Sequence, residues 1–294
     1  MDLLLAAHIV KNGLLIGGIY GGVALGLSLI FGVMRIINFA HGSLLMVAMY
    51  LAWFLWKTLG LHPYVAAFIT VPALFGLGYL IQSQIISHLF TREKALVVEP
   101  LSALLLTAGI FLVLDNLVLM IFGPDVRAVS VDIAYANFFI GEIPVNIPRF
   151  IAFVASIVVA SGLSYWLKHS NMGRAIRATA QNRDAATMSG INVPFIYNVT
   201  FGLGVAILGL FGALLVPFFS ITPTLGLSFG IKSFIVVVLG GIGSIWGCVV
   251  GGIVLGLFEA VASQFVTATS AAIFSFGLFI VILLVRPKGL MGKA

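Results

Sequence analysis

Long apolar runs separated by short polar breaks are the feature that most restricts how this chain can fold. The runs cover residues 12–31, 36–56, 62–88, 99–122, 149–167, 195–219, 231–263 and 270–285. A helix needs roughly 20 mostly apolar residues to cross a bilayer. Only 8% of the residues are charged, against about 25% in soluble domains, so too few charges exist to cover a water-soluble globule. The sequence predicts an all-α, polytopic membrane protein.

The run 231–263 is too long for a single crossing. A straight helix of this length would measure about 50 Å, and the hydrocarbon core is about 30 Å thick. The stretch Gly240–Ser244 lies inside the run and favours a break, so we expect two helices joined by a turn. Eight or nine crossings are then predicted, in one transmembrane domain over residues 1–294. Transmembrane strands are disfavoured, because barrels alternate apolar and polar residues over about ten positions.

The distribution of lysine and arginine predicts the orientation. Ten of the 15 basic residues fall on one side, and five, including Lys232, on the other. The ten are Arg35, Arg92, Lys94, Lys168, Arg174, Arg177, Arg183, Arg286, Lys288 and Lys293. Cytoplasmic loops carry the basic excess. We therefore expect segment 168–193 and the C-terminus in the cytoplasm and loop 123–148 outside.

Glycine recurs at four-residue spacing in the first run. Gly17 and Gly21 form such a pair, as do Gly18 and Gly22, and the late pair Gly252 and Gly256 repeats the spacing. Small residues let helix backbones approach closely in lipid. One interpretation is packing between helices of this subunit. Another, compatible with the first, is that these faces border a substrate path.

Polar residues interrupt the apolar runs at two places, Asn38–Ser43 and Gly240–Ser244. Interrupted helices mark binding paths in transporters, because a half-helix N-terminus presents free N–H groups. The candidate path residues are Tyr20, Asn38, His41, Gly241 and Ser244. The alternative is local: Asn38 caps the second helix near the cytoplasmic surface, and His41 is a hydrogen-bonded packing residue.

Two carboxylates, Asp115 and Glu259, lie inside predicted spans. A charge at the bilayer centre costs roughly 3 kcal/mol, so each needs a reason to be there. Either they pair with Lys232 or Arg149 or face water near the outer surface, or they line a path. Sequence spacing reveals no acidic–basic pair that could hold both charges of a zwitterion.

Segment 168–193 is too polar to span the membrane and is long for a helix–helix connection. Asn182 suits an N-cap, Asp184 a first helical turn and Gly190 a C-terminal cap. We expect short helices at the cytoplasmic surface with small residues outward and arginine alongside, seated in a groove of a cytosolic partner. The residues predicted to make this contact are Arg174, Ala175, Arg177, Ala178, Asn182, Asp184, Ala185, Ala186 and Gly190. The alternative is a solvated basic loop.

Blocks spread over residues 17–290 resemble the permeases of ABC importers for branched-chain amino acids. They are Gly17–Tyr20, Ala24–Leu27, Gly32–Gly42, Gly173–Ala178, Asn182–Ala186, Gly190–Ile191, Val238–Gly247 and Arg286–Leu290. Each block is weak alone, but their order and spacing together are specific. The Asn38–Gly42 block is similar to the shorter of the two paired permeases in such systems.

The resemblance implies a type II-like ABC importer transmembrane domain in the bacterial inner membrane. A second permease subunit, two cytosolic ATP-binding subunits and a periplasmic substrate-binding protein would be its partners, alongside membrane lipid. The region from Arg174 to Ala186 would be the coupling helix. The substrate would be a branched-chain or other neutral hydrophobic amino acid, although permeases for urea, short amides and aromatic acids belong to the same family.

The residues themselves agree with a transporter subunit that is no enzyme. The chain has no P-loop motif, so ATP would be hydrolysed by another chain. We expect no cofactor, no metal site and no nucleic acid. Cys248 has no partner cysteine, and the five histidines are scattered one per segment. The main rival is an ion-coupled secondary transporter that uses Asp115 and Glu259; a purely supporting subunit is a further alternative.

Overall fold

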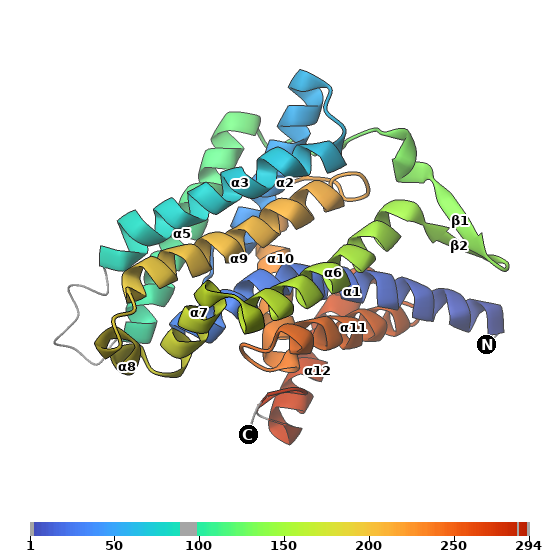
Figure 1. The fold of residues 1–294 in the computed structure, drawn as a ribbon. Coiled ribbons are helices and arrows are strands. Elements are labelled where there is room, and N and C mark those ends of the chain that lie inside the picture. The colour runs from blue at the N-terminus through green and yellow to red at the C-terminus, as the bar shows by residue number, and fades with distance from the viewer. Residues whose placement is uncertain (1–2, 89–98, 287, 293–294) are drawn as a thin grey trace.

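The computed structural model describes residues 3–88, 99–286 and 288–292, and it is built mainly of helices (Figure 1). The first half of the chain forms α1 (Leu3–Met34), α2 (His41–Leu59), α3 (Pro63–Leu80), the π-helical turn η1 (Ile81–Ile86) and α5 (Glu99–Phe122). The second half forms α6 (Ile147–His169), α7 (Asn171–Gln181), α8 (Arg183–Met188), α9 (Val193–Leu215), α10 (Leu225–Gly240), α11 (Ile245–Ala262) and α12 (Ala268–Val285).

The helices are long and apolar enough to confirm a polytopic membrane fold. In the described part of the chain, seven qualify as spans by length and composition: α1, α2, α3 with η1, α5, α6, α9 and α11. Helices α10 and α12 are shorter and apolar. Large apolar side chains on the outer helices, such as Phe68 and Met120, point away from the protein and are more than four-fifths exposed. Such an apolar exterior suits contact with lipid.

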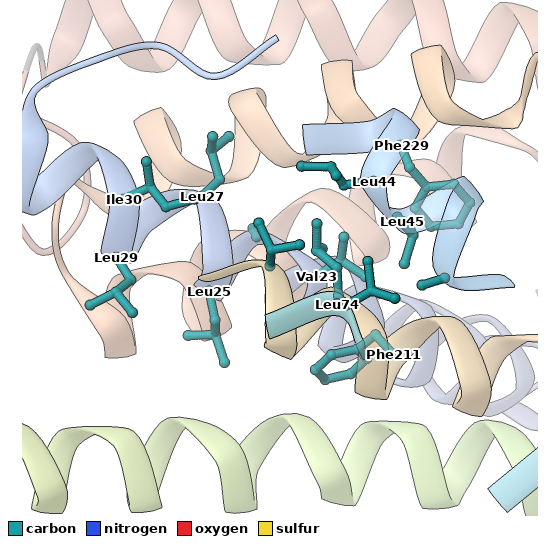
Figure 2. Close-up of a cluster of buried hydrophobic side chains, with 14 of the residues drawn as sticks. Val23, Leu25, Leu27, Leu29, Ile30, Leu44, Leu45, Leu74, Phe211 and Phe229 are labelled. Atoms are coloured by element: carbon teal, nitrogen blue, oxygen red, sulfur yellow. The ribbon is translucent and has the colours of Figure 1, made fainter. Parts of the chain in front are cut away.

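Helix α1 lies at the centre of the bundle over residues 17–30, all of which are buried. Figure 2 shows Val23 and Leu25 of α1 beside Phe211 of α9 and Leu44 of α2, and all four side chains are fully buried. Helices α6, α9, α10 and α11 all pack against α1. A hydrophobic face all round is what a fully buried helix requires.

Glycine lets α1 and α11 pack backbone to backbone. A Cβ atom added at Gly17 would lie 2.6 Å from the carbonyl oxygen of Gly252 and 2.7 Å from the Cα atom of Ile253. Gly13 and Gly21 meet α11 in the same way. The packing interpretation of the glycine spacing is therefore confirmed.

The predicted break in the run 231–263 is also confirmed. Helix α10 ends at Gly240 and α11 begins at Ile245. Gly241 and Gly243 have φ angles of 102° and 76°, a region that glycine enters without steric cost. The Ser244 hydroxyl then accepts a hydrogen bond from the Gly247 N–H at 3.1 Å and caps α11.

The start of the second span differs from the prediction. Helix α2 begins at His41 rather than near residue 36, because Arg35 takes a φ of 56° and ends helical geometry. Asn38 is not the N-cap: that position is Ala40, whose N–H donates to Asn38 Oδ1 at 3.1 Å. The side chain of Asn38 thus stabilises the turn before the helix.

The non-helical stretch before α2 enters the protein interior. Phe39 N–H donates to Thr107 Oγ1 at 3.2 Å, and Thr107 Oγ1 donates to the Ile37 carbonyl at 3.0 Å. His41 reaches the Val23 carbonyl of α1, and Val23 lies about 16 Å from the end of α1 at Met34. Irregular backbone at membrane depth is tolerated only where protein surrounds it, and Asn38 and His41 are both buried.

Loop 123–148 contains a small element that the sequence analysis did not predict. Strands β1 (Asn137–Ile140) and β2 (Ile143–Asn146) pair antiparallel after the 3-10 turn η2 (Asp132–Tyr135). Asn146 caps α6, since its Oδ1 accepts the Arg149 N–H at 3.3 Å. Lys11 near the start of α1 donates from Nζ to the Pro144 carbonyl of β2 at 2.6 Å.

The connecting segments gather at the two ends of α1, as Figure 1 shows for the hairpin and for α7–α8. Residues 33–36 at the end of α1 line a cavity together with residues 179–183. The C-terminal tail, residues 288–292, reaches the same end, where Leu290 N–H donates to the Leu239 carbonyl at 2.8 Å. This agrees with the predicted grouping of residue 35, segment 168–193 and the tail opposite loop 123–148. Arg92, Lys94 and Lys293, which entered that prediction, lie outside the described residues.

Candidate functional site

Two regions of the structure are candidates for function: the pair of short helices α7 and α8, and a group of polar side chains buried among the spans. The first region is shaped by caps. Ser170 Oγ accepts the Gly173 N–H at 2.8 Å and starts α7 directly after α6. Gly173 packs against the Leu167 backbone, where a Cβ atom would not fit. The chain therefore turns sharply from α6 into α7.

The predicted caps of α8 are confirmed. Asn182 Oδ1 accepts the N–H groups of Asp184 and Ala185, both at 3.0 Å. Gly190 follows the helix with a φ of 82°, and Pro194 lies in the first turn of α9. Such capping stabilises a helix of only six residues, which is too short to persist by backbone hydrogen bonds alone.

The exposed face of α7–α8 carries most of the residues predicted to contact a partner. Arg174, Arg177, Asn182, Asp184 and Ala185 are exposed. Gly190 is exposed as well, whereas Ala175 and Ala178 are half-buried. The guanidinium of Arg174 donates to the side chain of Asn171, and Arg177 Nη2 approaches the Lys168 carbonyl at 3.4 Å.

The structure differs from the prediction at Ala186, and it adds Met188. Ala186 lies on the inner face of α8 and is only 3% exposed. It therefore cannot present a small surface to a partner. Met188, at the end of α8, is 89% exposed. The flexible, polarizable side chain of methionine can adapt to a partner surface. Sequence reasoning missed Met188 because one methionine in a polar segment carries no pattern.

A cavity connects α7–α8 with the spanning helices. Its volume is about 440 Å³, and its lining includes Met34, Arg35, Asn182, Arg183 and Tyr197. The guanidinium of Arg183 lies 5.9 Å from the centre of the Tyr197 ring in α9. The junction between α7 and α8 therefore contacts the end of α1 and the start of α9, so a displacement of the two helices would reach both spans.

The second region is a cluster formed by Tyr20, Lys232, Glu259 and Ser275, from α1, α10, α11 and α12. Lys232 Nζ lies 2.9 Å from Glu259 Oε2 and 2.6 Å from the Tyr20 hydroxyl oxygen. The Tyr20 hydroxyl donates to the same carboxylate oxygen at 2.9 Å. Ser275 Oγ donates to the other oxygen, Oε1, at 3.3 Å. The predicted pairing of Glu259 with Lys232 is confirmed.

Asp115 is not paired with a cation among the described residues. Its Oδ1 accepts the Ser43 hydroxyl at 2.5 Å. Together with Asn38 and His41 it belongs to a second polar zone around the buried start of α2. His41 Nε2 lies 3.0 Å from the Val23 carbonyl oxygen, which confirms His41 as a hydrogen-bonded packing residue. The described residues hold no group of three metal-ligating side chains.

The five predicted path residues do not come together. Tyr20 belongs to the cluster with Lys232, while Asn38 and His41 lie at the start of α2. Gly241 and Ser244 belong to the turn between α10 and α11, which lies near the end of α1 at Met34, where Gly243 contacts Gly32. The glycine turn also receives the tail: Met291 N–H donates to the Gly240 carbonyl at 3.0 Å.

A cavity of about 450 Å³ opens at the hairpin end of the bundle. Its lining includes Tyr135, Asn146 and Arg149, with Phe218 and Phe219 after α9. Phe219 contacts Phe229 of α10 edge to face at 5.6 Å between ring centres, and Phe229 contacts Tyr20 at 6.2 Å. Successive ring contacts thus lead from this cavity to the buried cluster.

Comparison with known proteins identifies the family. The family model described as the permease component of branched-chain amino acid transport systems matches residues 9–285. The permease protein LivH of Escherichia coli K12 is 30% identical over 96% of this chain and 94% of its own length. BraD of Pseudomonas aeruginosa is 32% identical over the same shares. Both are named as high-affinity branched-chain amino acid transport permease proteins, and no solved structure matches the chain.

The match is continuous rather than confined to one motif. It includes the central glycine-rich α1, the break between α10 and α11 and the short helices α7 and α8. The structure is correspondingly a multi-pass helical bundle with an apolar exterior. The chain belongs to the family of permease components of branched-chain amino acid transport systems.

Proposed function

We propose that the chain is a transmembrane subunit of an ATP-driven importer in the bacterial inner membrane. It forms the passage for branched-chain or other neutral hydrophobic amino acids together with a second permease subunit. Two cytosolic ATP-binding subunits drive it, and a periplasmic binding protein delivers the substrate. The observation that carries the proposal is the exposed, capped pair α7–α8, which rests on the ends of α1 and α9.

The shape of α7–α8 supports its role as the contact for an ATPase. Its exposed residues include Arg174, Arg177 and Asp184, with the small Ala185 and Met188. A compact rigid projection of this kind fits a groove in a partner. Because the chain itself has no P-loop motif, ATP would be hydrolysed by another chain, and α7–α8 is where its motion would reach the spans.

The basic residues support the orientation. The end of the bundle with Arg35, α7–α8 and the tail carries the excess of lysine and arginine, which favours the cytoplasm. The hairpin end, with its cavity beside Arg149, then faces the periplasm and receives the substrate from the binding protein.

The substrate class is supported by the named transport of the relatives and by the apolar interior. LivH and BraD belong to branched-chain amino acid systems. Urea, short amides and aromatic acids are alternative substrates, and a panel of solutes separates them. We expect leucine, isoleucine and valine to be accumulated and urea to be excluded.

Uptake into proteoliposomes tests the energy source. The chain is reconstituted with the subunits that co-purify with it, with ATP inside and the binding protein outside. Labelled leucine should accumulate only when ATP and the ATPase subunits are present. Accumulation driven by a proton or sodium gradient without the ATPase would refute the proposal and favour a secondary transporter.

Substitutions on α7–α8 test the coupling. Replacing Ala178 or Ala185 with tryptophan places a bulky side chain where the partner groove should close. We expect leucine uptake to fall at least tenfold while ATP hydrolysis continues. Ala185→Ser keeps the side chain small and should preserve coupling. Equal uptake-to-hydrolysis ratios for Ala185→Trp and Ala185→Ser would argue against this contact.

A further inference from the structure

We propose that the cluster of Tyr20, Lys232 and Glu259 is a binding site for a zwitterionic amino acid within the passage. The ammonium of Lys232 would hold the substrate carboxylate, and the carboxylate of Glu259 would hold the substrate ammonium. This inference rests on the proposed function and adds the residues that would recognise the shared backbone of its substrates.

The cluster lies within apolar helices rather than in a loop. Tyr20 lies about 21 Å along α1 from Met34, Lys232 lies near the middle of α10, and Glu259 lies three residues before the end of α11 at Ala262. Charged residues within membrane segments are rare and mark ion or substrate pathways. In this subunit the side chains of Lys232 and Glu259 are 25% and 14% exposed, so the pair is partly accessible.

The charges of the cluster match those of a zwitterion. The pair has no net charge before binding. When a substrate enters between Nζ and Oε2, now 2.9 Å apart, each charge exchanges one partner for another and none is left alone. An ion carrying a single charge would instead leave one side chain unpaired, which is strongly unfavourable in a buried site.

The surrounding groups allow the pair to open. The Tyr20 hydroxyl touches both charges, and Ser275 holds the second oxygen of Glu259. Both contacts would keep each charge hydrogen-bonded while the pair separates. Lys232 has a flexible four-carbon stem, and its Nζ lies 4.5 Å from the centre of the Tyr20 ring, so the ammonium can move without losing all contact.

An apolar wall adjoins the cluster on the side of the hairpin cavity. Phe229 contacts Tyr20, and Phe219 joins Phe229 to the cavity of about 450 Å³. A branched aliphatic side chain would pack against these rings. Charged groups for the backbone and an aromatic wall for the side chain together describe a neutral, hydrophobic amino acid.

A purely structural salt bridge is the competing explanation, and ligand selectivity separates the two. The complex of the permease and ATPase subunits, without the binding protein, is placed in nanodiscs without ethanolamine lipid and titrated with three probes, and binding is followed by saturation-transfer NMR. Leucine carries both charges, 4-methylpentanoate lacks the ammonium, and 3-methylbutylamine lacks the carboxylate. The wild-type complex should bind leucine and neither analogue.

Single substitutions should invert this preference. Glu259→Gln leaves Lys232 unpaired, so leucine binding should weaken at least tenfold and 4-methylpentanoate binding should strengthen at least tenfold. Lys232→Met should do the same for 3-methylbutylamine. The double variant Lys232→Met, Glu259→Gln leaves no charge unpaired and should bind neither analogue, and its assembly with the ATPase controls for folding.

The outcomes distinguish this inference from the proposed function. If the wild-type complex imports leucine with ATP but the variants keep the wild-type order of probe binding, the cluster is structural and the inference is wrong. If a variant fails to assemble, the other single variant decides. Absence of ATP-driven leucine uptake by the wild-type complex would refute the proposed function, whatever the probes show.

Discussion

Because α1 and α11 touch through their backbones, adding a single methyl group at Gly17 should destabilise the protein. Gly17→Ala places a Cβ atom 2.6 Å from the Gly252 carbonyl oxygen and 2.7 Å from the Ile253 Cα atom. Both atoms belong to the backbone, so no side chain can rotate away. The two helices must separate by most of an ångström, or the bundle must distort.

The expected cost follows from that separation. A gap of 0.5–1 Å forfeits about a quarter to a half of each dispersion contact across an interface, and overpacking costs about 1–3 kcal/mol. Alanine recovers about 0.5–1 kcal/mol through its better helix propensity. We therefore expect a net loss of about 1–2 kcal/mol. The matched control is Gly162→Ala in α6, where a Cβ atom meets nothing within 4 Å, so only the propensity gain remains.

Thermal unfolding in detergent, followed by fluorescence-detected size exclusion, measures both variants against the wild type. The unfolding temperature should fall for Gly17→Ala and should stay equal or rise for Gly162→Ala. If the two variants shift the temperature equally, close backbone packing is not what glycine provides at position 17, and the reasoning about the glycine spacing fails.

Three further predictions concern α7, α8 and the glycine turn, which lie near the end of α1 at Met34. Asn182→Ala removes the acceptor of two N–H groups and should lower the stability of α8 by about 1 kcal/mol. Amide hydrogen exchange at Asp184 should then be roughly fivefold faster. An unchanged exchange rate would show that the Asn182 cap does not stabilise α8. Met188→Asp should weaken co-purification of the ATPase, and Met188→Leu should preserve it. Gly241→Ala would require alanine to adopt a φ of 102°, and its Cβ atom would lie 2.5 Å from the Gly292 nitrogen. The tail should therefore be displaced from the turn and be cleaved faster in limited proteolysis. Equal cleavage rates for the variant and the wild type would contradict this.

Local features were predictable from the sequence, because each depends on residues close in the chain. The Asn182 cap, the Gly190 terminus and the break after Gly240 all depend on short-range backbone geometry. The glycine spacing in α1 also predicted a packing face, since four-residue periodicity is a property of the helix itself.

Features that depend on tertiary contact were not predictable. The buried entry to α2 required Thr107 to bond with both Ile37 and Phe39, which no spacing reveals. Sequence analysis named Lys232 as one of two possible partners for Glu259, but the choice needed the packing of α10 on α11. The meeting of this pair with Tyr20, 212 positions away from Lys232, was not foreseen. Ala186 faced inward because the register of α8 on the bundle sets which alanine is covered.

The central claim is that α7–α8 receives the ATPase on the cytoplasmic side, and cysteine labelling tests it directly. The native Cys248 is fully buried, so single cysteines can be introduced without removing it. Ala185→Cys lies on α8, and Tyr135→Cys lies at the hairpin end, where the tyrosine is 80% exposed.

A membrane-impermeant maleimide should label Tyr135→Cys in spheroplasts and Ala185→Cys in inverted vesicles, and the bound ATPase should protect Ala185→Cys from labelling. Labelling of Ala185→Cys from the periplasmic side would contradict the orientation. Equal labelling of Ala185→Cys with and without the ATPase would contradict the contact.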